Sequence, residues 1–337
     1  MNKVLIISVT IFSLVLVELG LRYSNKLKTY SEQNFDSYSS AYSSEGLKHL
    51  YVWNPNDTTE IEQIEFSFTY ETNEYGLVKT KQSSALDTIE KIIFLGDSFV
   101  FGIGASPDSS LPVFLSEKLH IPIVNAGIPG SDPFFEEKLI DSIFLSKLYN
   151  KYLIMVNCSD LYDYIFRGGE ERFLPNNQVE YHKAPELEKY YKNSYLLRAI
   201  VHGILKMDYS LLSKEKAIAL KFEAVEVYTA LLLKIAKQKN LIVVIQPYAR
   251  QYSDNNSVMK ETLNYSYLNL LESKLIKNSV RTINLDKHLK NRINKNNYLN
   301  YSWNIDGHYN AKGYALLSEI LAEELTLKYP EFINAKE

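Results

Sequence analysis

The sequence is poor in cysteine and has no excess of basic residues. Cys158 is the one cysteine among 337 residues, so an intrachain disulfide and a cysteine-rich zinc site are both excluded. The 37 Lys and Arg against 40 Asp and Glu give a formal net charge of −3, which argues against a dedicated nucleic-acid binder. Hydrophobic residues, at 46%, suffice for a sizeable core and exclude a disordered or collagenous chain.

Several motifs of known chemistry are also absent. The chain has no G-x-S-x-G nucleophile elbow, no G-x-x-x-x-G-K phosphate loop and no H-E-x-x-H metal motif. Gly102-Ile103-Gly104 lacks the third glycine of a dinucleotide-binding fingerprint. We therefore expect a protein that uses no nucleotide cofactor and no metal.

The N-terminus carries a long apolar run from Val4 to Leu21, interrupted by Glu18. As a helix it would span about 27 Å, close to the thickness of the hydrocarbon core of a bilayer. The run ends in Glu-Leu-Gly-Leu-Arg, which is a poor signal-peptidase site. We predict an uncleaved membrane anchor over residues 1–22, with a cleaved signal peptide and a buried core helix as the alternatives.

The composition changes twice after this run. Residues 23–60 are mostly polar and predict a linker, and 61–330 are expected to form the main domain. Within that domain, 61–70 partly alternate apolar and polar residues, which predicts a half-buried strand. Residues 160–210 show no clear strand pattern and are expected to form an insertion.

From residue 91 on, short apolar runs alternate with segments of helical length. The runs predict buried strands at 91–95, 121–126, 152–157, 241–247 and 280–285. The helical segments are 110–119, 133–149, 215–239, 258–276 and 311–328. This alternation predicts an α/β fold, a three-layer α/β/α (flavodoxin-like) parallel sheet, with an N-terminal membrane helix. Such sheets bind ligands at the carboxyl ends of their strands.

The last of these helices shows the apolar spacing of an amphipathic helix. We expect one face to carry Leu316, Leu317, Ile320, Leu321 and Leu327, with Glu324 interrupting that face.

The first strand of the alternation runs directly into Gly96-Asp97-Ser98. A serine at this position is well placed to act as a nucleophile, and Gly96 allows a sharp turn of the chain. A serine hydroxyl needs a base to take its proton. The alternative for Ser98 is a helix cap.

The candidate base is His308, which lies just before the last helix. Asp306 stands two residues upstream, and in a turning loop its carboxylate can reach the imidazole and hold its tautomer. The alternative is a capping or surface role for these residues. His288 also has an acidic neighbour, Asp286, but no glycine turn lies between them.

Two other strand ends carry candidate donors for a developing oxyanion. Gly127 ends the second strand and can bring its backbone N–H close to the negative charge. Asn157 and Ser159 follow the third strand and offer side-chain donors. A plain turn role is the alternative for each of the three.

Together these segments resemble the SGNH (GDSL-like) hydrolase superfamily, and the GDSFVFG stretch after an N-terminal apolar run resembles its membrane-anchored members. The resemblance covers residues 70–327 and implies ester hydrolysis or acyl transfer. It implies Ser98 as nucleophile, His308 as base, Asp306 as the residue that orients His308, and the N–H groups of Ser98 and Gly127 as oxyanion donors.

The chain departs from that family pattern at two places. Ser159-Asp160 stands where the family usually has Asn-Asp, which leaves Ser159 or Asn157 as the substitute side-chain donor. Only Gly307 separates Asp306 from His308, where the family often has two residues.

Three functions follow from these observations. The first is a membrane-anchored serine esterase, with its catalytic domain outside the cytoplasm, that hydrolyses an acyl ester of a carbohydrate or lipid. The second is an O-acyltransferase that acts on an envelope polysaccharide. The third is a non-catalytic glycan-binding or assembly module, which the serine at position 159 suggests. None of the three needs a nucleic-acid partner.

Overall fold

The computed structural model describes residues 3–24, 27, 29, 42–43, 52–81, 91–142, 149–167, 169–173, 188–205, 214–253 and 265–333. Its main sheet has five parallel strands, which are β5 (Lys91–Gly96), β6 (Ile123–Gly127), β7 (Tyr149–Val156), β8 (Asn240–Ile245) and β9 (Arg281–Asn284). Their spatial order is β6-β5-β7-β8-β9. This is the flavodoxin-like order of a doubly wound sheet, so the predicted α/β fold is confirmed.

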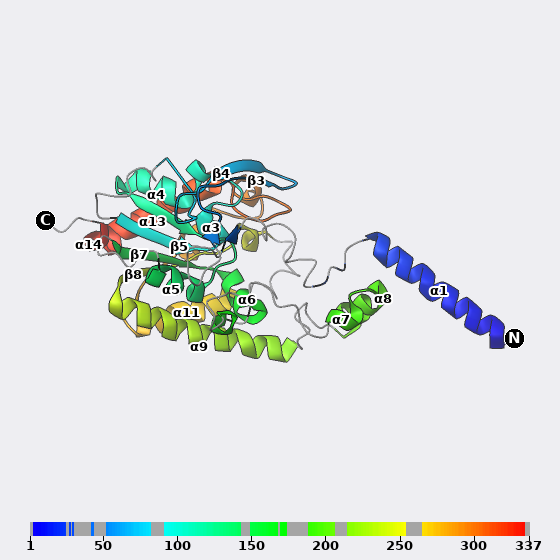
Figure 1. The fold of residues 1–337 in the computed structure, drawn as a ribbon. Helices are drawn as coiled ribbons and strands as arrows, with labels where there is room; N and C mark the ends of the chain where they lie inside the picture. The colour runs from blue at the N-terminus through cyan, green and yellow to red at the C-terminus, as the bar shows by residue number, and fades with distance from the viewer. Residues whose placement is uncertain are drawn as a thin grey trace.

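Helices cover both faces of the sheet (Figure 1). One face packs against α4 (Leu111–Leu119), α13 (Ala311–Lys328) and α14 (Pro330–Ile333). The opposite face packs against α5 (Pro133–Ser142), α6 (Cys158–Arg167), α9 (Lys214–Gln238) and α11 (Tyr265–Lys277). The shorter helical elements after residue 91 include α3 (Ser98–Phe101), η2 (Pro107–Ser109), η3 (Gly169–Arg172), η5 (Ala249–Tyr252), α12 (Asp286–Leu289) and η6 (Tyr298–Asn300).

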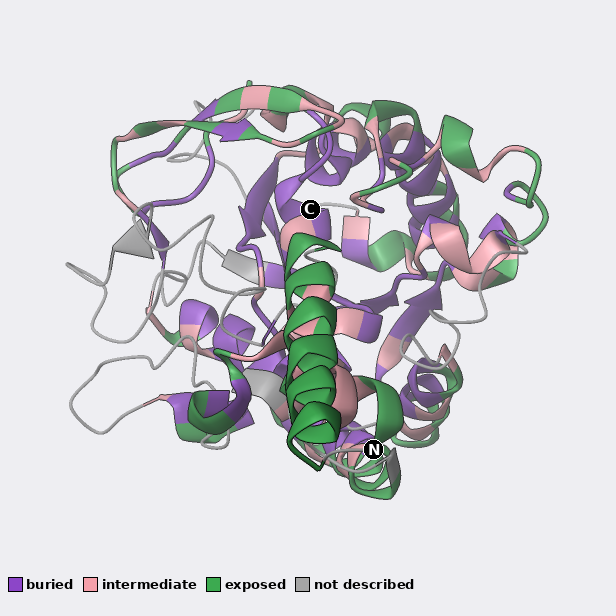
Figure 2. Cartoon of the chain, turned by 90° about the vertical axis from the view of Figure 1, so that its right-hand side faces the viewer, coloured by how far each residue is buried: buried purple, intermediate pink, exposed green. Residues whose placement is uncertain are grey.

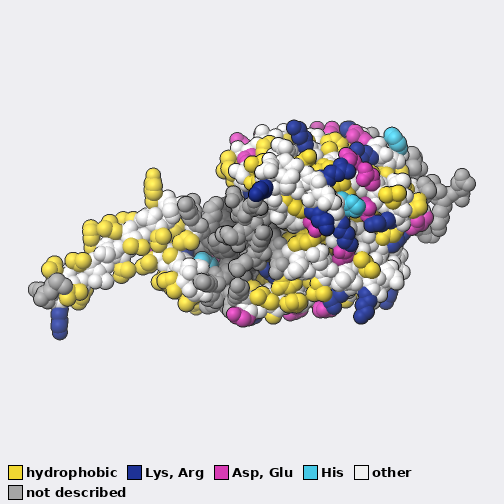
Figure 3. Space-filling model, turned by 180° about the vertical axis from the view of Figure 1, so that it is seen from behind, with side chains coloured by type: hydrophobic (Ala, Val, Ile, Leu, Met, Phe, Trp, Pro, Cys, Tyr) yellow, Lys and Arg dark blue, Asp and Glu magenta, His cyan; other side chains and the backbone are white. Residues whose placement is uncertain are grey.

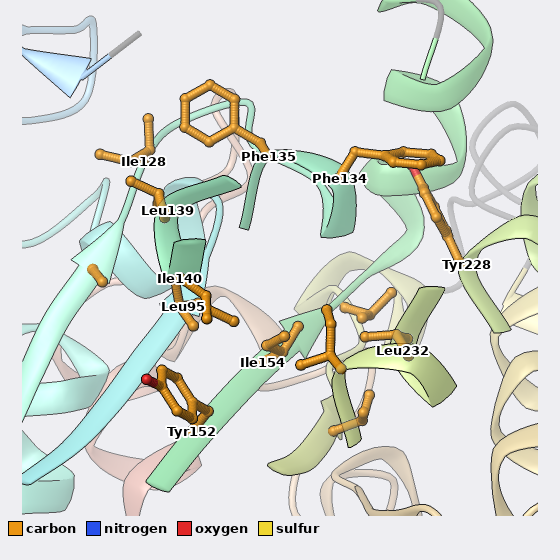
Figure 4. Packing of buried hydrophobic residues seen from close by; sticks show 14 of the residues in the cluster. Leu95, Ile128, Phe134, Phe135, Leu139, Ile140, Tyr152, Ile154, Tyr228 and Leu232 are labelled. Atoms are coloured by element: carbon orange, nitrogen blue, oxygen red, sulfur yellow. The ribbon is translucent and has the colours of Figure 1, made fainter. Parts of the chain in front are cut away.

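The strands are apolar throughout because both of their faces are buried. In β5, Ile92 and Phe94 enter the core on the α13 side, whereas Ile93 and Leu95 enter the core on the α9 side. All four side chains are at most 1% exposed. Figure 4 shows Leu95 and Ile154 of adjacent strands facing the α5 and α9 side chains that cover this face of the sheet.

Two predicted segment lengths differ from the structure. The helix expected at 133–149 ends at Ser142, and Tyr149 already belongs to β7. Residues 143–148 lie outside the described residues, as do residues 258–264 of the helix expected at 258–276.

The buried face of α13 differs from the predicted one near its end. Leu327 is 77% exposed, and Leu325 is buried in its place. Glu324 is also buried, and its carboxylate lies 3.1 Å from His288 Nε2 and pairs with Lys328. The polar residue that interrupts the predicted apolar face is therefore accommodated by contacts with two partly exposed side chains, His288 and Lys328.

The segment predicted as one strand at 61–70 is an antiparallel hairpin of β3 (Thr58–Glu62) and β4 (Ser67–Glu71). A second, smaller pair is formed by β1 (Tyr42–Ser43) and β2 (Val52–Trp53). Trp53 packs on Tyr70 and Phe101, with ring centroids 5.0 and 5.5 Å away. Val52 and Trp53 lie in the predicted linker (23–60) but are buried in this core, so the packed part of the chain begins before residue 61.

The apolar N-terminal run forms α1 (Lys3–Ser24), a 22-residue helix that contains an 18-residue stretch with a mean hydropathy of 2.5. None of its residues is buried, and Figure 2 shows it exposed along its length. The alternative of a buried core helix is therefore wrong. The described part of the predicted insertion (160–210) is helical, and after α6 and η3 it contains α7 (Glu188–Tyr191), α8 (Tyr195–Arg198) and the π-helix η4 (Ala199–Ile204).

Candidate active site

Ser98 lies where β5, the strand between β6 and β7, ends and α3 begins. Gly96 adopts φ +155°, and a Cβ on it would lie 2.5 Å from Val100 Cγ2, so a glycine is required for this turn. Asp97 caps α3, because its Oδ1 accepts the Phe99 N–H at 2.9 Å. β5 has β6 on one side and β7 on the other, so Ser98 stands at the point where the strand order reverses.

His308 and Asp306 meet Ser98 from the loop before α13. The His308 Nε2 atom is 2.8 Å from Ser98 Oγ, although 210 positions separate the two residues. The His308 Nδ1 atom is 2.5 Å from Asp306 Oδ1. The three side chains that the sequence singles out as a triad therefore form one continuous chain of contacts.

Gly307 makes the short Asp-x-His spacing possible. Its φ of +91° turns the loop back, so that Asp306 Oδ1 also accepts the His308 backbone N–H at 3.1 Å. A Cβ at this position would meet the Arg250 guanidinium at 2.9 Å. One glycine is thus enough to bring the Asp306 carboxylate back to the imidazole two residues on.

The imidazole is also held by packing. Its ring lies 4.7 Å from the Phe99 ring, centroid to centroid. The Trp303 N–H donates to the His308 carbonyl at 3.0 Å, and Trp303 Nε1 donates to the Gly104 carbonyl at 2.7 Å. These contacts fix the loop against the turn that follows α3.

The charge on Asp306 is stabilised within the loop. Burial acts to raise the pKa of the Asp306 carboxyl, but the hydrogen bonds and charge of His308, with Arg250, lower this pKa below its ordinary value. An ionised Asp306 accepts the Nδ1 proton of His308. In this tautomer Nδ1 carries the proton, and Nε2 is free to accept the Ser98 hydroxyl proton, as a general base must.

The second Asp–His pair in the sequence does not form a contact of this kind. Asp286 accepts hydrogen bonds from Gln251 and Tyr252, and His288 faces Glu324. Asp286 and His288 therefore serve as a control pair for Asp306 and His308, because they have the same spacing in the sequence but do not contact each other in the same way.

The structure does not bring all predicted oxyanion donors into the site. The Gly127 N–H donates to Asn125 Oδ1 at 3.0 Å, within its own strand end. A Cβ on Gly127 would lie 2.1 Å from the Phe101 nitrogen, so this glycine is required for the close approach of β6 to α3. Its observed role is in packing.

Asn157 and Ser159 are turned toward Asp97. The Asn157 amide donates to Asp97 Oδ2 at 2.8 Å, and Asn157 is fully buried. Ser159 Oγ lies 3.0 Å from the same oxygen and 2.5 Å from Asn157 Oδ1. These contacts tie the ends of β5 and β7 together and occupy both predicted side-chain donors.

One predicted donor has no partner in the described structure. The Ser98 backbone N–H makes no hydrogen bond to any described residue, and Ser98 is partly exposed. It is therefore the donor that remains available to a ligand beside Ser98 Oγ. Among the described residues, no group of three or more His, Cys, Asp or Glu side chains is arranged to hold a metal ion.

Glu65, which the sequence pattern did not single out, lies in the β3–β4 turn and holds the loop that carries Asp306 and His308. Its carboxylate accepts the backbone N–H groups of Asn304 at 3.0 Å, Ile305 at 2.7 Å and Asp306 at 3.0 Å. The adjacent Phe66 ring packs on Trp303 with centroids 5.6 Å apart. We interpret Glu65 as a positioning residue that acts through Asp306.

Replacing Glu65 with Gln removes the charge and turns an NH₂ group toward backbone donors. Hydrogen bonds to charged groups contribute about 1.5–3 kcal/mol, so we expect ester turnover (kcat) to fall roughly 10-fold while KM changes little. Steady-state kinetics with an aryl ester measure this split. The Glu62→Gln control on the same hairpin should retain wild-type kcat, and an equal kcat for both variants would contradict the positioning role.

A buried acidic group lies next to the Ser98 turn. Asp132 and Arg172 form an ion pair at 2.5 Å, and both side chains are at most 1% exposed. Glu136 is fully buried nearby. Burial raises the pKa of the Glu136 carboxyl well above its ordinary value, and the charges of Asp132 and Asp97 add to this rise. Glu136 therefore keeps its proton to a higher pH in the folded protein than in the unfolded chain.

This raised pKa predicts a pH-dependent stability change. The unfolded chain releases the Glu136 proton above about pH 4.5, whereas the folded chain retains it, so this residue costs more stability as the pH rises. At pH 8, Glu136→Gln should raise the melting temperature by about 2–4 °C for each kcal/mol of stability gained. At pH 4.5 the same change should leave the melting temperature nearly unchanged. Thermal unfolding at both pH values, with Glu74→Gln as control, measures the effect. A gain that does not depend on pH would contradict the assignment.

Similarity to known proteins is found among solved structures. No protein-family model matches the sequence, and no curated protein matches it. Among solved structures, a lipase/acylhydrolase from Enterococcus faecalis is 15% identical, with coverage of 70% of this chain and 95% of that chain, and a TM-score of 0.40. An acetylxylan esterase from Geobacillus stearothermophilus is 14% identical, with coverage of 73% and 97% and a TM-score of 0.42. Both likenesses concern the fold alone.

Proposed function

We propose that this protein is a serine esterase that hydrolyses an acyl ester of a carbohydrate or lipid. The observation that carries the proposal is the contact chain from Asp306 through His308 to Ser98, with distances of 2.5 and 2.8 Å. A nucleophile within hydrogen-bond reach of a base, which is itself oriented by a third group, is the arrangement that covalent acyl transfer requires.

In the first half of the proposed reaction, Ser98 Oγ attacks the ester carbonyl carbon and His308 Nε2 takes the hydroxyl proton. The bond between the carbonyl carbon and the alcohol oxygen then breaks, and the alcohol leaves with the proton from His308. In the second half, water attacks the acyl-Ser98 ester and gives its proton to His308. The carboxylic acid leaves, and Ser98 regains its proton.

The negative charge on the carbonyl oxygen is proposed to be stabilised by the Ser98 backbone N–H. Asn157 and Ser159 instead hydrogen-bond Asp97. Loss of one oxyanion donor costs about 10²–10³ in kcat in a well-studied protease, so we expect slower turnover than an enzyme with a complete set of donors.

We further propose that α1 stays attached and anchors the chain in a membrane, with the catalytic domain outside the cytoplasm. The apolar length of this helix supports the proposal. A membrane-bound esterase encounters substrates that are themselves part of an envelope or a bilayer.

The test is ester turnover by the detergent-purified full chain. We expect the release of the acid and the aryl alcohol from a short-chain aryl ester in equal amounts. Addition of a carbohydrate acceptor should leave the yield of free acid unchanged. An acylated carbohydrate that forms at the expense of free acid would identify an O-acyltransferase, and no turnover would contradict both enzyme functions.

A further inference from the structure

Glu18 is the one acidic residue in the apolar run of α1, and it lies near the C-terminal end of that helix. The helix axis from Lys3 to Arg22 measures about 28 Å at 1.5 Å per residue, close to the roughly 30 Å of a bilayer core. Glu18 is one turn before Arg22 and therefore lies just inside the boundary of that core. A carboxylate at this depth is costly unless it has partners.

The partners of Glu18 come from the predicted insertion, more than 170 positions away. Its carboxylate oxygens accept the Tyr195 N–H at 2.9 Å, the Leu196 N–H at 2.7 Å and the Ser194 hydroxyl at 3.1 Å. The Arg22 guanidinium, one turn further along α1, also lies 3.2 Å from the Glu18 carboxylate. The carboxylate thus satisfies the first backbone donors of α8, which have no partner within that helix.

Further contacts join the same two segments. The Arg22 guanidinium donates to the Asn193 carbonyl at 3.0 Å and lies 5.4 Å from the centre of the Tyr195 ring. Arg198 donates to the Leu27 carbonyl at 2.8 Å. Figure 1 shows α8 beside α1, away from the sheet. The contact therefore rests on several bonds from both sides and not on Glu18 alone.

The segment from Glu188 to Leu205 also exposes apolar side chains. Ile204 is 72% exposed and Leu205 is 60% exposed, and Tyr190 and Leu197 are exposed as well. Figure 3 shows hydrophobic side chains over α1 and over the segment next to it. A soluble domain rarely leaves such a group uncovered. Basic and tyrosine side chains adjoin it, which is the composition of a membrane–water interface.

We propose that the Glu188–Leu205 segment is a membrane-interface element that lies in the lipid headgroup and upper acyl region, docked to α1 by Glu18. The proposal rests on the anchoring role of α1 stated above. The occupant of the exposed apolar surface is lipid, because this surface continues that of a helix of bilayer length. The catalytic domain is thereby attached to the membrane at two separate places in the sequence, which fixes its orientation toward a surface-bound substrate.

Site-directed spin labels on the full chain test the location of this segment. Single cysteines are introduced at Val9 in α1, at Ile204, and at Leu327, which is 77% exposed on α13. Cys158 is buried, and burial raises the pKa of its thiol, so the parent chain serves as the unlabelled blank. The labelled proteins are reconstituted in phosphatidylethanolamine–phosphatidylglycerol vesicles, and collision with oxygen is compared with collision with a water-soluble nickel chelate.

We expect oxygen to dominate at Val9 and Ile204 and the nickel chelate to dominate at Leu327. If Ile204 behaves as Leu327 does while Val9 lies in lipid, the interface element is overturned and the anchor stands. If Val9 is also in water, the anchor fails and the interface element fails with it.

Glu18→Ala tests the docking contact itself. This change leaves the donors of Ser194, Tyr195 and Leu196 without their carboxylate, so the Ile204 label should gain collisions with the nickel chelate while the Val9 label stays in lipid. Glu18→Gln retains one acceptor and should have an intermediate effect. An Ile204 signal that is the same in all three proteins would overturn the role of Glu18.

Discussion

Ser98→Ala is expected to lower ester turnover by roughly 10⁴-fold or more, because no other group can form the acyl intermediate. His308→Ala is expected to have a similar effect, because it removes the base that lies 2.8 Å from Ser98 Oγ. The two residues act as one unit across a 2.8 Å contact, so the double variant should be no worse than either single variant. Hydrolysis of a short-chain aryl ester by the purified full chain measures all three.

Two matched controls separate loss of chemistry from loss of fold. Ser106→Ala removes an exposed hydroxyl that hydrogen-bonds Ser109, and His288→Ala removes the histidine of the other Asp-x-His pair. Both control variants should retain turnover, and both active-site variants should retain the wild-type circular dichroism spectrum. Turnover that persists in folded Ser98→Ala would refute the proposed nucleophile.

Asp306→Asn is the second change with a large expected effect. An asparagine amide turned toward Nδ1 favours the tautomer in which Nε2 carries the proton, and such a histidine cannot accept from Ser98. The equivalent change in a serine protease lowers kcat about 10⁴-fold, and we expect a loss of the same order. The measurement is the turnover of the wild-type protein and of Asp306→Asn as a function of pH, over the same pH range.

The direction of the pH effect follows from the lowered pKa of Asp306. Because the folded pKa lies below the ordinary value, the carboxylate stays ionised through mildly acidic pH and loses its charge only as the pH falls through that lowered pKa. Protonation of Asp306 therefore does not limit wild-type turnover at mildly acidic pH. Asp286→Asn, at the second Asp-x-His pair, should leave the profile unchanged. An equal loss in both variants would contradict the orienting role of Asp306.

The main sheet and the meeting of Ser98 with His308 were predictable from the sequence. Buried parallel strands are continuous apolar runs, and the segments 91–95 and 241–247 are of this type. The carboxyl ends of such strands share one edge of the sheet, which places Ser98 on the side where a loop before the last helix can reach it. Gly307 indicated the turn that brings Asp306 to the imidazole.

The donor set of the site was not predictable in the same way. Gly127, Asn157 and Ser159 stand at the expected strand ends, but local hydrogen bonds compete for them. The Asn125 side chain takes the Gly127 N–H, and the Asp97 carboxylate takes the other two groups. Side-chain orientation decides between such partners, and residue spacing carries no information about it.

Two other features gave no local signal. The β3–β4 turn at Gln63–Phe66 contains neither glycine nor proline, so the hairpin reads as one alternating strand. Glu65 belongs to this turn and lies about 240 positions from the loop that it holds. Glu18 likewise appears in the sequence only as a single acidic residue in an apolar helix. Its hydrogen-bond partners in α8 are known only from the three-dimensional structure.

The most direct test of the central claim is labelling of the full chain with a fluorophosphonate, which reacts with an activated serine hydroxyl, followed by peptide mapping. We expect one adduct, on Ser98, and its loss in His308→Ala. An adduct on a different serine, or no adduct on the folded wild-type protein, would contradict the claim that His308 activates Ser98, and the absence of any adduct would favour a glycan-binding module.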